Sequence, residues 1–325
     1  MTNTAKTINP SNRSKFNCRI CGSSDGVIDV FPEKIFGTFK KFEYFECNEC
    51  GCVQIIDIPE DMSQYYPEEY GSHTPVSAKK IKPYKRMICR ILLTASSRPF
   101  FKSFLQRVLK QSSIFRWLLT AGVSNESKVL DVGCGMGGLL CKMWNCGVHT
   151  LVGIDPFIPS PINYKKNFHI IKGDINQISE QFDLIICNHS LEHMPNQNIL
   201  GVLRDLLTEQ GCLIIRIPLS QKYLWKTFRE NWAQLDPPRH LFLHSEKSFH
   251  KLADSNGFEV FQTFNECHAG SVASSEKLKK NLSYSLSNKK VFTDEERKNF
   301  VQFAKKLRLN NEGDQATFFL KKKLH

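Results

Sequence analysis

Residues 128–138 read KVLDVGCGMGG, a short apolar strand that runs directly into a glycine-rich turn. Gly133, Gly135 and Gly137 allow a tight strand-to-helix turn and let a ligand lie against bare backbone. The spacing alone is ambiguous, because Gly133, Gly135 and Gly138 also satisfy the GxGxxG pattern of dinucleotide-binding proteins. The stretch therefore predicts an α/β fold with a nucleoside-type ligand at the end of its first strand.

Short apolar runs alternate with helical patterns beyond this turn. The runs KVLDV, TLVGID, FHIIKG, FDLIIC and CLIIRI suit buried parallel strands. Between the last two, residues 196–211 carry a wide apolar stripe, which predicts a helix that ends at Gly211. The alternation predicts a doubly wound parallel sheet with helices on both faces, which binds its ligand at the carboxyl ends of the strands.

Three carboxylates follow the expected strands and indicate which nucleoside ligand fits. Asp131 precedes the first glycine by two residues, where it would repel a pyrophosphate but could bind an ammonium group. A buried acid needs a cationic or hydrogen-bonding partner, although Asp131 could also simply cap the loop. Asp155 could accept hydrogen bonds from both ribose hydroxyls. Asp174 could accept from an adenine amino group or be a simple loop aspartate.

The ordered series LDVGCGMGG, VGIDP, KGDI, FDLIICNHSLEHMPN and GCLIIRIPLS resembles the motifs of class I S-adenosylmethionine-dependent methyltransferases. The resemblance implies an enzyme with a Rossmann-like, seven-stranded sheet whose last strand is antiparallel, and GFEVFQTFN and GDQATFFLKKK fit the closing pair. It also implies S-adenosylmethionine as the cofactor. The predicted cofactor contacts are Asp131, Gly133, Cys134, Gly135, Gly137, Asp155, Pro156, Asp174, Ile175 and Asn188.

Polar residues cluster after the fourth expected strand, in NHSLEHMP. Asn188 and His189 are expected at the strand end facing the sulfonium, with Glu192 and His193 one turn later. The LEH sequence resembles that of small-molecule methyltransferases, in which it shapes the cofactor and acceptor pocket. Alternatively, these groups only make hydrogen bonds where a helix starts.

A second polar segment, PPRHLFLHS at 237–245, follows the fifth strand. Its prolines stiffen the loop, and histidine titrates near neutrality, as a general base should. The segment resembles a loop of bacterial sugar and surface-polysaccharide methyltransferases. This implies His240 as base or substrate ligand and Arg239 as the group that holds an anion such as a diphosphate, unless both only tie down the loop. The catalytic candidates are therefore His240, Arg239, His193 and His189.

Four of the twelve cysteines form two CxxC pairs, and each pair is followed by a glycine that permits a tight turn. In a reducing compartment such a set predicts a closed, structural zinc site, with free thiols or another metal as alternatives. The long gap between the pairs predicts an inserted hairpin. The predicted ligands are Cys18, Cys21, Cys47 and Cys50.

The segment QYYPEEY follows this module, as in the zinc-binding domain of the same sugar methyltransferases that the chain resembles. In that setting Tyr66 and Tyr70 could close over the acceptor or pack against the zinc module. We expect the zinc-binding module at 1–75, a basic helical linker or lid at 76–118 and the methyltransferase domain at 119–325. A helical insertion is expected at 266–311, before the last strand.

The net charge is +12, and no Asp or Glu occurs between Gly71 and Asn125. Such a block indicates a polyanionic partner (nucleic acid, phosphorylated substrate or membrane surface) or a solvated helical face. Peripheral membrane contact through 76–118 is one such option. Because the chain has no secretory signal and no apolar stretch long enough to span a membrane, we expect a cytoplasmic protein.

The leading functional prediction is methyl transfer to a small molecule. The acceptor would be a nucleotide-linked or otherwise phosphorylated sugar in polysaccharide, other glycan or natural-product biosynthesis. An RNA methyltransferase is the alternative, since zinc and positive charge also suit nucleic acid. A non-catalytic scaffold that binds S-adenosylmethionine is a third reading, against which the intact glycines, Asp131 and Asp155 argue.

Overall fold

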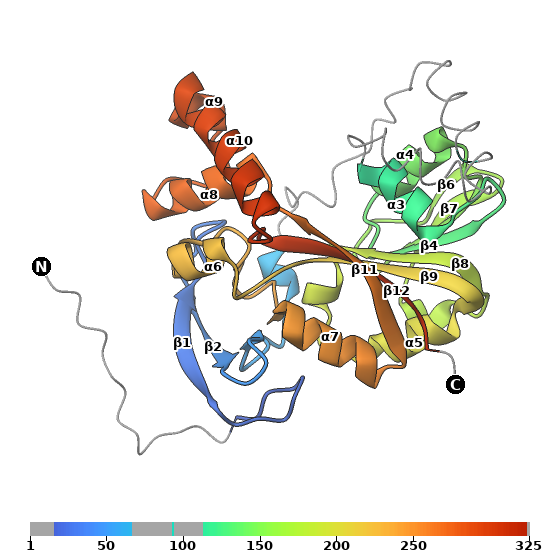
Figure 1. Ribbon diagram of the computed structural model, residues 1–325, viewed down its shortest axis with the longest axis horizontal. Coiled ribbons are helices and arrows are strands. Elements are labelled where there is room, and N and C mark those ends of the chain that lie inside the picture. Colours follow the sequence, from blue (N-terminus) through green and yellow to red (C-terminus); the bar gives the residue numbers. More distant parts are fainter. Residues whose placement is uncertain (1–15, 67–92, 94–112, 324–325) are drawn as a thin grey trace, which may run out of the picture.

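The computed structural model describes residues 16–66, 93 and 113–323. Tyr70, Cys89 and most of the basic segment predicted at 76–118 lie outside these residues. The end of that segment belongs to helix α3 (Ser113–Ala121). The described part contains a large and a small sheet, both visible in Figure 1.

The larger sheet has eight strands in the order β11-β12-β9-β8-β4-β5-β7-β6. Its parallel strands are β4 (Lys128–Val132), β5 (Thr150–Asp155), β7 (Phe168–Lys172), β8 (Phe182–Asn188) and β9 (Leu207–Pro218). Strand β12 (Gln315–Lys322) lies antiparallel between β9 and β11 (Phe258–Glu266). The predicted doubly wound α/β sheet with a reversed last strand is therefore confirmed. An eighth strand that we did not anticipate, β6 (Ile162–Lys165), adds antiparallel to β7 at the edge.

Helices cover both faces of this sheet because its strands are apolar on both sides. Leu130 of β4 packs in one buried cluster with α5 (Ile199–Asp205) and α7 (Glu246–Ser255). Val129, the preceding residue, packs in another cluster with α3 and α4 (Gly138–Cys146). Successive side chains of a strand point to opposite faces, so both layers of helices are needed to exclude water from the sheet (Figure 1).

The prediction of a helix that ends at Gly211 is wrong. Helix α5 ends at Asp205, and β9 begins at Leu207 and runs through Gly211. The pairing of β8 with β9 is irregular between Phe182 and Leu184. A Cβ at Gly211 would lie 3.1 Å from the carbonyl oxygen of Phe182. The glycine therefore permits a close approach of backbones at an irregular strand start and does not cap a helix.

The smaller sheet joins the cysteine-rich region to the loop that follows β9. Its order is β1 (Gly26–Pro32), β2 (Lys41–Cys47), β3 (Val53–Ile55) and β10 (Phe242–Leu243). Strands β1 and β2 form a hairpin between the two cysteine pairs, as the long gap predicted. Strand β10 belongs to the PPRHLFLHS segment and pairs with β3. The smaller sheet is thus built from the N-terminal cysteine-rich region and from the segment between β9 and α7.

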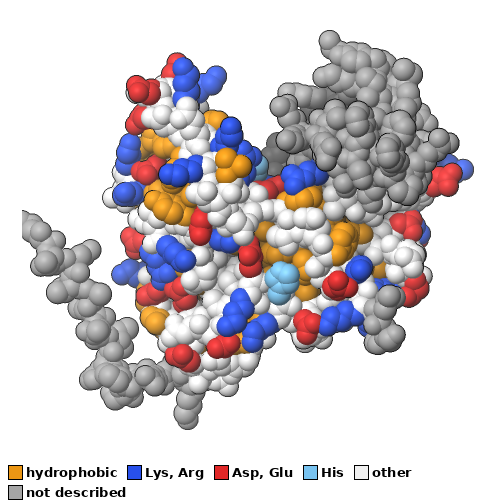
Figure 2. Space-filling model, in the orientation of Figure 1, with side chains coloured by type: hydrophobic (Ala, Val, Ile, Leu, Met, Phe, Trp, Pro, Cys, Tyr) orange, Lys and Arg blue, Asp and Glu red, His pale blue; other side chains and the backbone are white. Residues whose placement is uncertain are grey.

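Three helices lie between β11 and β12, in the segment predicted as a helical insertion. They are α8 (Ala269–Lys279), α9 (Asn288–Val291) and α10 (Asp294–Leu309), and they project from one end of the larger sheet (Figure 1). On the face displayed in Figure 2, their Lys and Arg side chains are interspersed with Asp and Glu. Among the described residues, no helix has the length and apolar character that crossing a membrane requires.

Candidate active site

The loop after β4 adopts a backbone that only glycine tolerates well. The φ angles of Gly133, Gly135 and Gly137 are 71°, 52° and 74°. A Cβ on Gly133 would lie 2.5 Å from Cβ of Ser190, and one on Gly137 would lie 2.5 Å from Cδ1 of Ile170. Both the conformation and the space therefore require glycine, and the loop presents bare backbone to a ligand.

The carboxylate that ends β5 holds this loop in place. Asp155 accepts the N–H of Gly135 at its Oδ2 and the N–H of Phe157 at its Oδ1, both at 2.8 Å. Each oxygen keeps a lone pair for a further donor, as hydroxyl groups of a ribose would supply. Pro156 is exposed beside it, whereas burial raises the pKa of the Cys134 thiol, which keeps that thiol protonated.

The carboxyl group of Asp131 is buried and has no cationic partner in the part of the chain that the structure describes. Its side chain is 2% exposed at the end of β4. Burial, and then the negative charge of Asp155, raise the pKa of Asp131 to about 8. A cationic ligand would relieve this cost, so the site fits an ammonium group.

The remaining predicted cofactor contacts occupy neighbouring strand ends. Asp174 is exposed, and its Oδ1 accepts the backbone N–H of Asn176 at 3.0 Å, which caps a short 3₁₀ turn. Ile175, inside that turn, is buried. Asn188 ends β8, and its Oδ1 accepts a hydrogen bond from Arg216 at 3.4 Å. The structure therefore brings the predicted cofactor residues to one edge of the larger sheet.

A buried carboxylate lies in the 3₁₀ turn η5 (Leu191–His193), which follows β8. Glu192 is fully buried, and its Oε1 lies 3.1 Å from Nδ1 of His189. Burial favours the neutral form, but the hydrogen bond and charge of His189, followed by the charges of His193 and His240, lower the pKa of Glu192 to about 2. The LEH motif thus places an ionised group inside the protein.

His240 packs against His193, so the two polar segments that the sequence indicated meet in space. Their ring centroids are 4.7 Å apart. The Nδ1 of His240 lies 2.7 Å from the carbonyl oxygen of Gln234, and its own carbonyl accepts a hydrogen bond from Tyr44 at 2.9 Å. Burial, and then repulsion from His193, lower the pKa of His240 to about 4. A carbonyl can only accept, so Nδ1 carries the proton and Nε2 keeps its lone pair.

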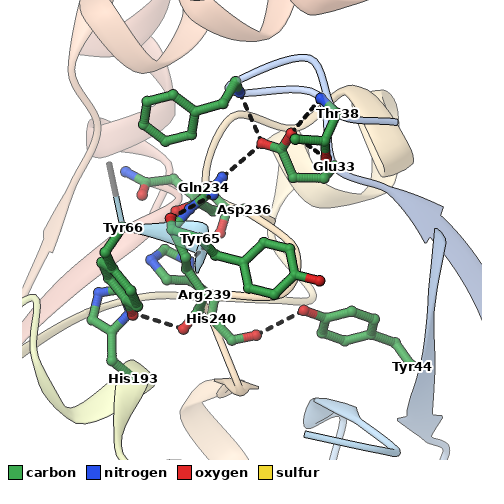
Figure 3. A network of polar contacts seen from close by, with 11 residues as sticks. Glu33, Thr38, Tyr44, Tyr65, Tyr66, His193, Gln234, Asp236, Arg239 and His240 are labelled. Atoms are coloured by element: carbon green, nitrogen blue, oxygen red, sulfur yellow. Dashed lines mark hydrogen bonds and ion pairs between the residues drawn. The ribbon is translucent and has the colours of Figure 1, made fainter. Parts of the chain in front are cut away.

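Arg239 lies in a buried network and does not face an open site (Figure 3). Its side chain is 1% exposed and pairs with Glu33 at 2.8 Å and with Asp236. It also donates to the carbonyl oxygen of Tyr65 at 3.1 Å. Two carboxylates neutralise the guanidinium inside the protein, which argues against the predicted role of Arg239 in holding an anionic group.

Replacing Arg239 with methionine is expected to destabilise the fold by about 3–5 kcal/mol, because Glu33 and Asp236 would lose their counter-charge. Urea unfolding measures this. The control is Lys321→Met, since Lys321 pairs with Glu259 at the surface, where such a loss costs about 1 kcal/mol or less. Unchanged stability of Arg239→Met combined with a raised KM for the acceptor would restore the anion-binding role.

Tyr66 connects the cysteine-rich region to the strand-end loops. Its ring stacks on Phe157, the residue after Pro156, with centroids 5.6 Å apart and an interplanar angle of 13°. Its hydroxyl lies 3.3 Å from Nδ1 of His193. Tyr66 therefore lies over the cofactor side and the histidine side at once, a position compatible with the predicted contact to the acceptor.

Several supporting residues escaped the sequence analysis. Glu33 binds Arg239, Tyr44 binds the His240 carbonyl and Gln234 binds the His240 ring. Glu33 and Tyr44 are separated from their partners by about two hundred positions in the chain, and no local motif marks them. Gln234 lies within the loop, but a backbone carbonyl has no sequence signature.

The four paired cysteines converge as predicted. The Sγ atoms of Cys18 and Cys50 are 3.6 Å apart, those of Cys21 and Cys47 are 3.5 Å apart, and all four lie within 4.8 Å of one another. Tetrahedral zinc with Zn–S bonds of about 2.3 Å needs sulfur–sulfur distances of about 3.8 Å. Gly22 and Gly51, which follow the pairs, have φ angles of 77° and 73°. The donor set and geometry therefore fit zinc.

The strand order, the glycine loop and the carboxylates at the ends of β4 and β5 define a Rossmann-like α/β enzyme with a nucleoside cofactor. The model of the family described as a methyltransferase domain matches residues 101–263, and the chain belongs to this family. The protein is an S-adenosylmethionine-dependent methyltransferase, and its sheet order with the reversed last strand is that of the class I fold.

Known relatives are distant. A magnesium-protoporphyrin O-methyltransferase of Synechocystis is 23% identical over 164 residues, which cover 46% of this chain and 71% of that protein. Peramine synthetase ppzA of Metarhizium rileyi is 28% identical over 95 residues, which cover 24% of this chain and only 3% of that protein. The solved O-methyltransferase from the trans-AT PKS multienzyme of Brevibacillus brevis, in complex with S-adenosyl-L-homocysteine, is 13% identical. It covers 75% of this chain and 82% of that chain, with a TM-score of 0.40.

Proposed function

We propose that the enzyme methylates a hydroxyl group of a small-molecule acceptor, and that this acceptor is a sugar carried on a nucleotide or otherwise phosphorylated. The observation that carries the proposal is the cluster of Glu192, His193 and His240 beside the cofactor edge of the sheet. A hydroxyl acceptor must lose a proton, whereas an amine or thiol depends less on a base. A cluster whose imidazoles keep their Nε2 lone pairs suits the first case.

The sugar class is supported by the likeness of PPRHLFLHS and QYYPEEY to segments of sugar methyltransferases. The phosphorylated form rests on the basic composition of residues 76–118, now that Arg239 is paired within the protein. We propose that Nε2 of His240 faces the acceptor hydroxyl and that Tyr66 covers it. His193 lines the same space, and His189 holds Glu192.

For the cofactor, we propose that Asp131 binds the ammonium group and Asp155 the ribose hydroxyls. Asp174 and Ile175 would contact the adenine, and Asn188 would lie near the sulfonium. Cofactor binding supplies an activated methyl donor. The chain itself contributes alignment of the acceptor and exclusion of water, which can provide most of the acceleration of methyl transfer.

We further propose that Cys18, Cys21, Cys47 and Cys50 hold a structural zinc ion. Four thiolates close the coordination sphere, so the ion would have no open position for chemistry. Its place in the fold supports a role in positioning, because Gln54 of β3 donates to the Cys18 sulfur at 3.1 Å and pairs with Phe242 of β10.

Methyl-labelled S-adenosylmethionine, incubated with the protein and an extract of the source cells, tests the proposed acceptor. We expect label in the nucleotide-sugar or lipid-linked fraction, and no label with Asp131→Asn. Label that becomes acid-soluble only after ribonuclease treatment would replace the sugar with RNA. Label in neither fraction would remove the sugar proposal and leave the methyltransferase class intact.

The raised pKa of Asp131 predicts a proton release on cofactor binding. The free carboxyl, with a pKa of about 8, is mostly protonated at pH 7, whereas binding an ammonium group requires the carboxylate. Affinity for S-adenosylhomocysteine should therefore rise between pH 6 and pH 8, by up to about tenfold per pH unit. Calorimetry in buffers of different ionisation enthalpy measures the released proton. Affinity that does not change with pH would contradict this coupling.

A further inference from the structure

Glu192, His193 and His240 form a second cluster of metal-binding side chains, separate from the four cysteines. One potential ligand atom from each of the three lies within 4.8 Å of the others. Glu192 and His240 are buried and His193 is partly buried. The residues come from two segments, the turn after β8 and the loop before β10. The backbone N–H of Leu241 donates to the carbonyl of Glu192 at 2.8 Å, which holds these segments together.

Both imidazoles are already oriented in the way that metal ligands are. Nδ1 of His193 lies 2.8 Å from the carbonyl oxygen of Arg239, and Nδ1 of His240 lies 2.7 Å from that of Gln234. Each ring therefore donates its Nδ1–H to a backbone carbonyl and keeps the Nε2 lone pair. Metal-ligating histidines characteristically have their second nitrogen fixed by such a partner, which sets the tautomer and the ring orientation.

The carboxylate supplies an independent indication that something is bound there. Glu192 is fully buried, and its Oε1 is engaged by His189. Its Oε2 is also buried, and among the described residues no group makes a hydrogen bond to it. A buried carboxylate oxygen without a hydrogen-bond donor is costly. A cation bound by this oxygen and by the two nearby imidazole nitrogens would remove that cost.

The distances suit a single ion. With metal–ligand bonds of about 2.0–2.2 Å, two ligand atoms on one ion lie roughly 3–4 Å apart, so side-chain movements on the order of 1 Å complete the set. The two ring centroids, 4.7 Å apart, would each lie about 3.2 Å from an ion bound at Nε2, which corresponds to roughly a right angle between the rings at the ion.

We propose that Glu192, His193 and His240 bind one divalent transition-metal ion. Two imidazoles and one carboxylate are the set that holds catalytic zinc or non-haem iron(II) with open coordination positions, unlike the closed set of four thiolates. The inference rests on the proposed function, because the open positions would take the hydroxyl oxygens of the acceptor. Vicinal hydroxyl groups of a sugar can occupy two such positions, so the ion would orient the acceptor toward the cofactor. Nε2 of His240 would then act on the acceptor through the ion, which favours loss of the hydroxyl proton, instead of taking that proton itself.

Calorimetric titration with cobalt(II), using full-length protein that holds a single equivalent of zinc at the cysteine site, tests the proposal. Zinc binds more tightly than cobalt(II) to a given site, so the cysteine site should keep its zinc. We expect one equivalent of cobalt(II) to bind the wild type. Glu192→Gln and His240→Gln should each weaken this binding at least tenfold, while His250→Gln, which changes an exposed histidine on α7, should not.

Affinity for S-adenosylhomocysteine is the control for folding. It should be the same in all variants, which shows that each one is folded. A zinc-loaded wild type that binds no cobalt(II) would overturn the proposal, and so would cobalt(II) binding that Glu192→Gln leaves unchanged. The proposed function is judged separately by the labelled acceptor fraction. Cobalt(II) binding without a methylated sugar would support the metal site and reject the sugar. A methylated sugar formed by protein that binds no cobalt(II) would support the sugar and reject the metal site.

Discussion

Replacing His240 with glutamine is expected to lower kcat for methyl transfer by about 10²–10⁴-fold and to leave the affinity for S-adenosylhomocysteine unchanged. The proposed role of His240 lies at Nε2, which keeps its lone pair because Nδ1 donates to the Gln234 carbonyl. That lone pair would act on the acceptor hydroxyl either as a base or as a ligand of the proposed ion. Glutamine can replace the hydrogen bond to that carbonyl but has no basic nitrogen. The cofactor residues at the ends of β4 and β5 do not contact His240, so cofactor binding should persist.

Single-turnover rates and calorimetry with S-adenosylhomocysteine separate the two effects. The control is again His250→Gln, which changes the same residue type on the exposed side of α7. If His240 had a purely structural role, replacing it would lower the unfolding midpoint and weaken cofactor binding as well as lower the rate. A variant that keeps the wild-type rate would remove His240 from the acceptor site.

The sequence was sufficient for the cofactor half of the site because its signals are local. The glycine loop, Asp131 and Asp155 lie directly at strand ends, and the parallel sheet brings those ends to one edge. The strands themselves were predictable from their apolar runs. Gly211 was misinterpreted because the apolar stripe before it continues into β9, and only the pairing with Phe182 shows where the helix gives way to the strand.

The acceptor half depended on contacts between distant segments. Arg239 resembled an anion-binding residue, but its partner Glu33 lies 206 positions earlier in the chain, and no local pattern announces that pair. The juxtaposition of Glu192 with His240 is likewise invisible in the sequence, because the turn after β8 and the loop before β10 meet only once β9 and β12 are in place. The residue types in the sequence indicated which chemistry was available. Only the structure showed which charged side chains, such as Arg239, are already paired within the protein.

Removing the zinc ion that we propose at the four-cysteine site is expected to lower kcat by about 10–100-fold while cofactor binding persists. The reason is the connection between the cysteine-rich region and the His240 loop. Tyr44 of β2 donates to the His240 carbonyl at 2.9 Å, and Ser245, just after β10, donates to the Cys50 carbonyl. Without the ion, the small sheet loses the stabilisation that a structural zinc site gives, roughly 10–16 kcal/mol of binding free energy in zinc-finger peptides. The loop would then lose its support.

Cys47→Ser, with zinc content, kcat and affinity for S-adenosylhomocysteine measured on the same preparation, makes this test specific. The matched control is Cys52→Ala, because Cys52 is buried between β2 and β3 of the same sheet but lies outside the four-sulfur cluster. We expect Cys52→Ala to keep its zinc and most of its activity. Wild-type kcat in a zinc-free Cys47→Ser protein would show that the His240 loop holds its position alone. Loss of cofactor binding together with kcat would instead mean that the two sheets unfold as one unit, since β10 hydrogen-bonds with β3 while its neighbours pack against the larger sheet.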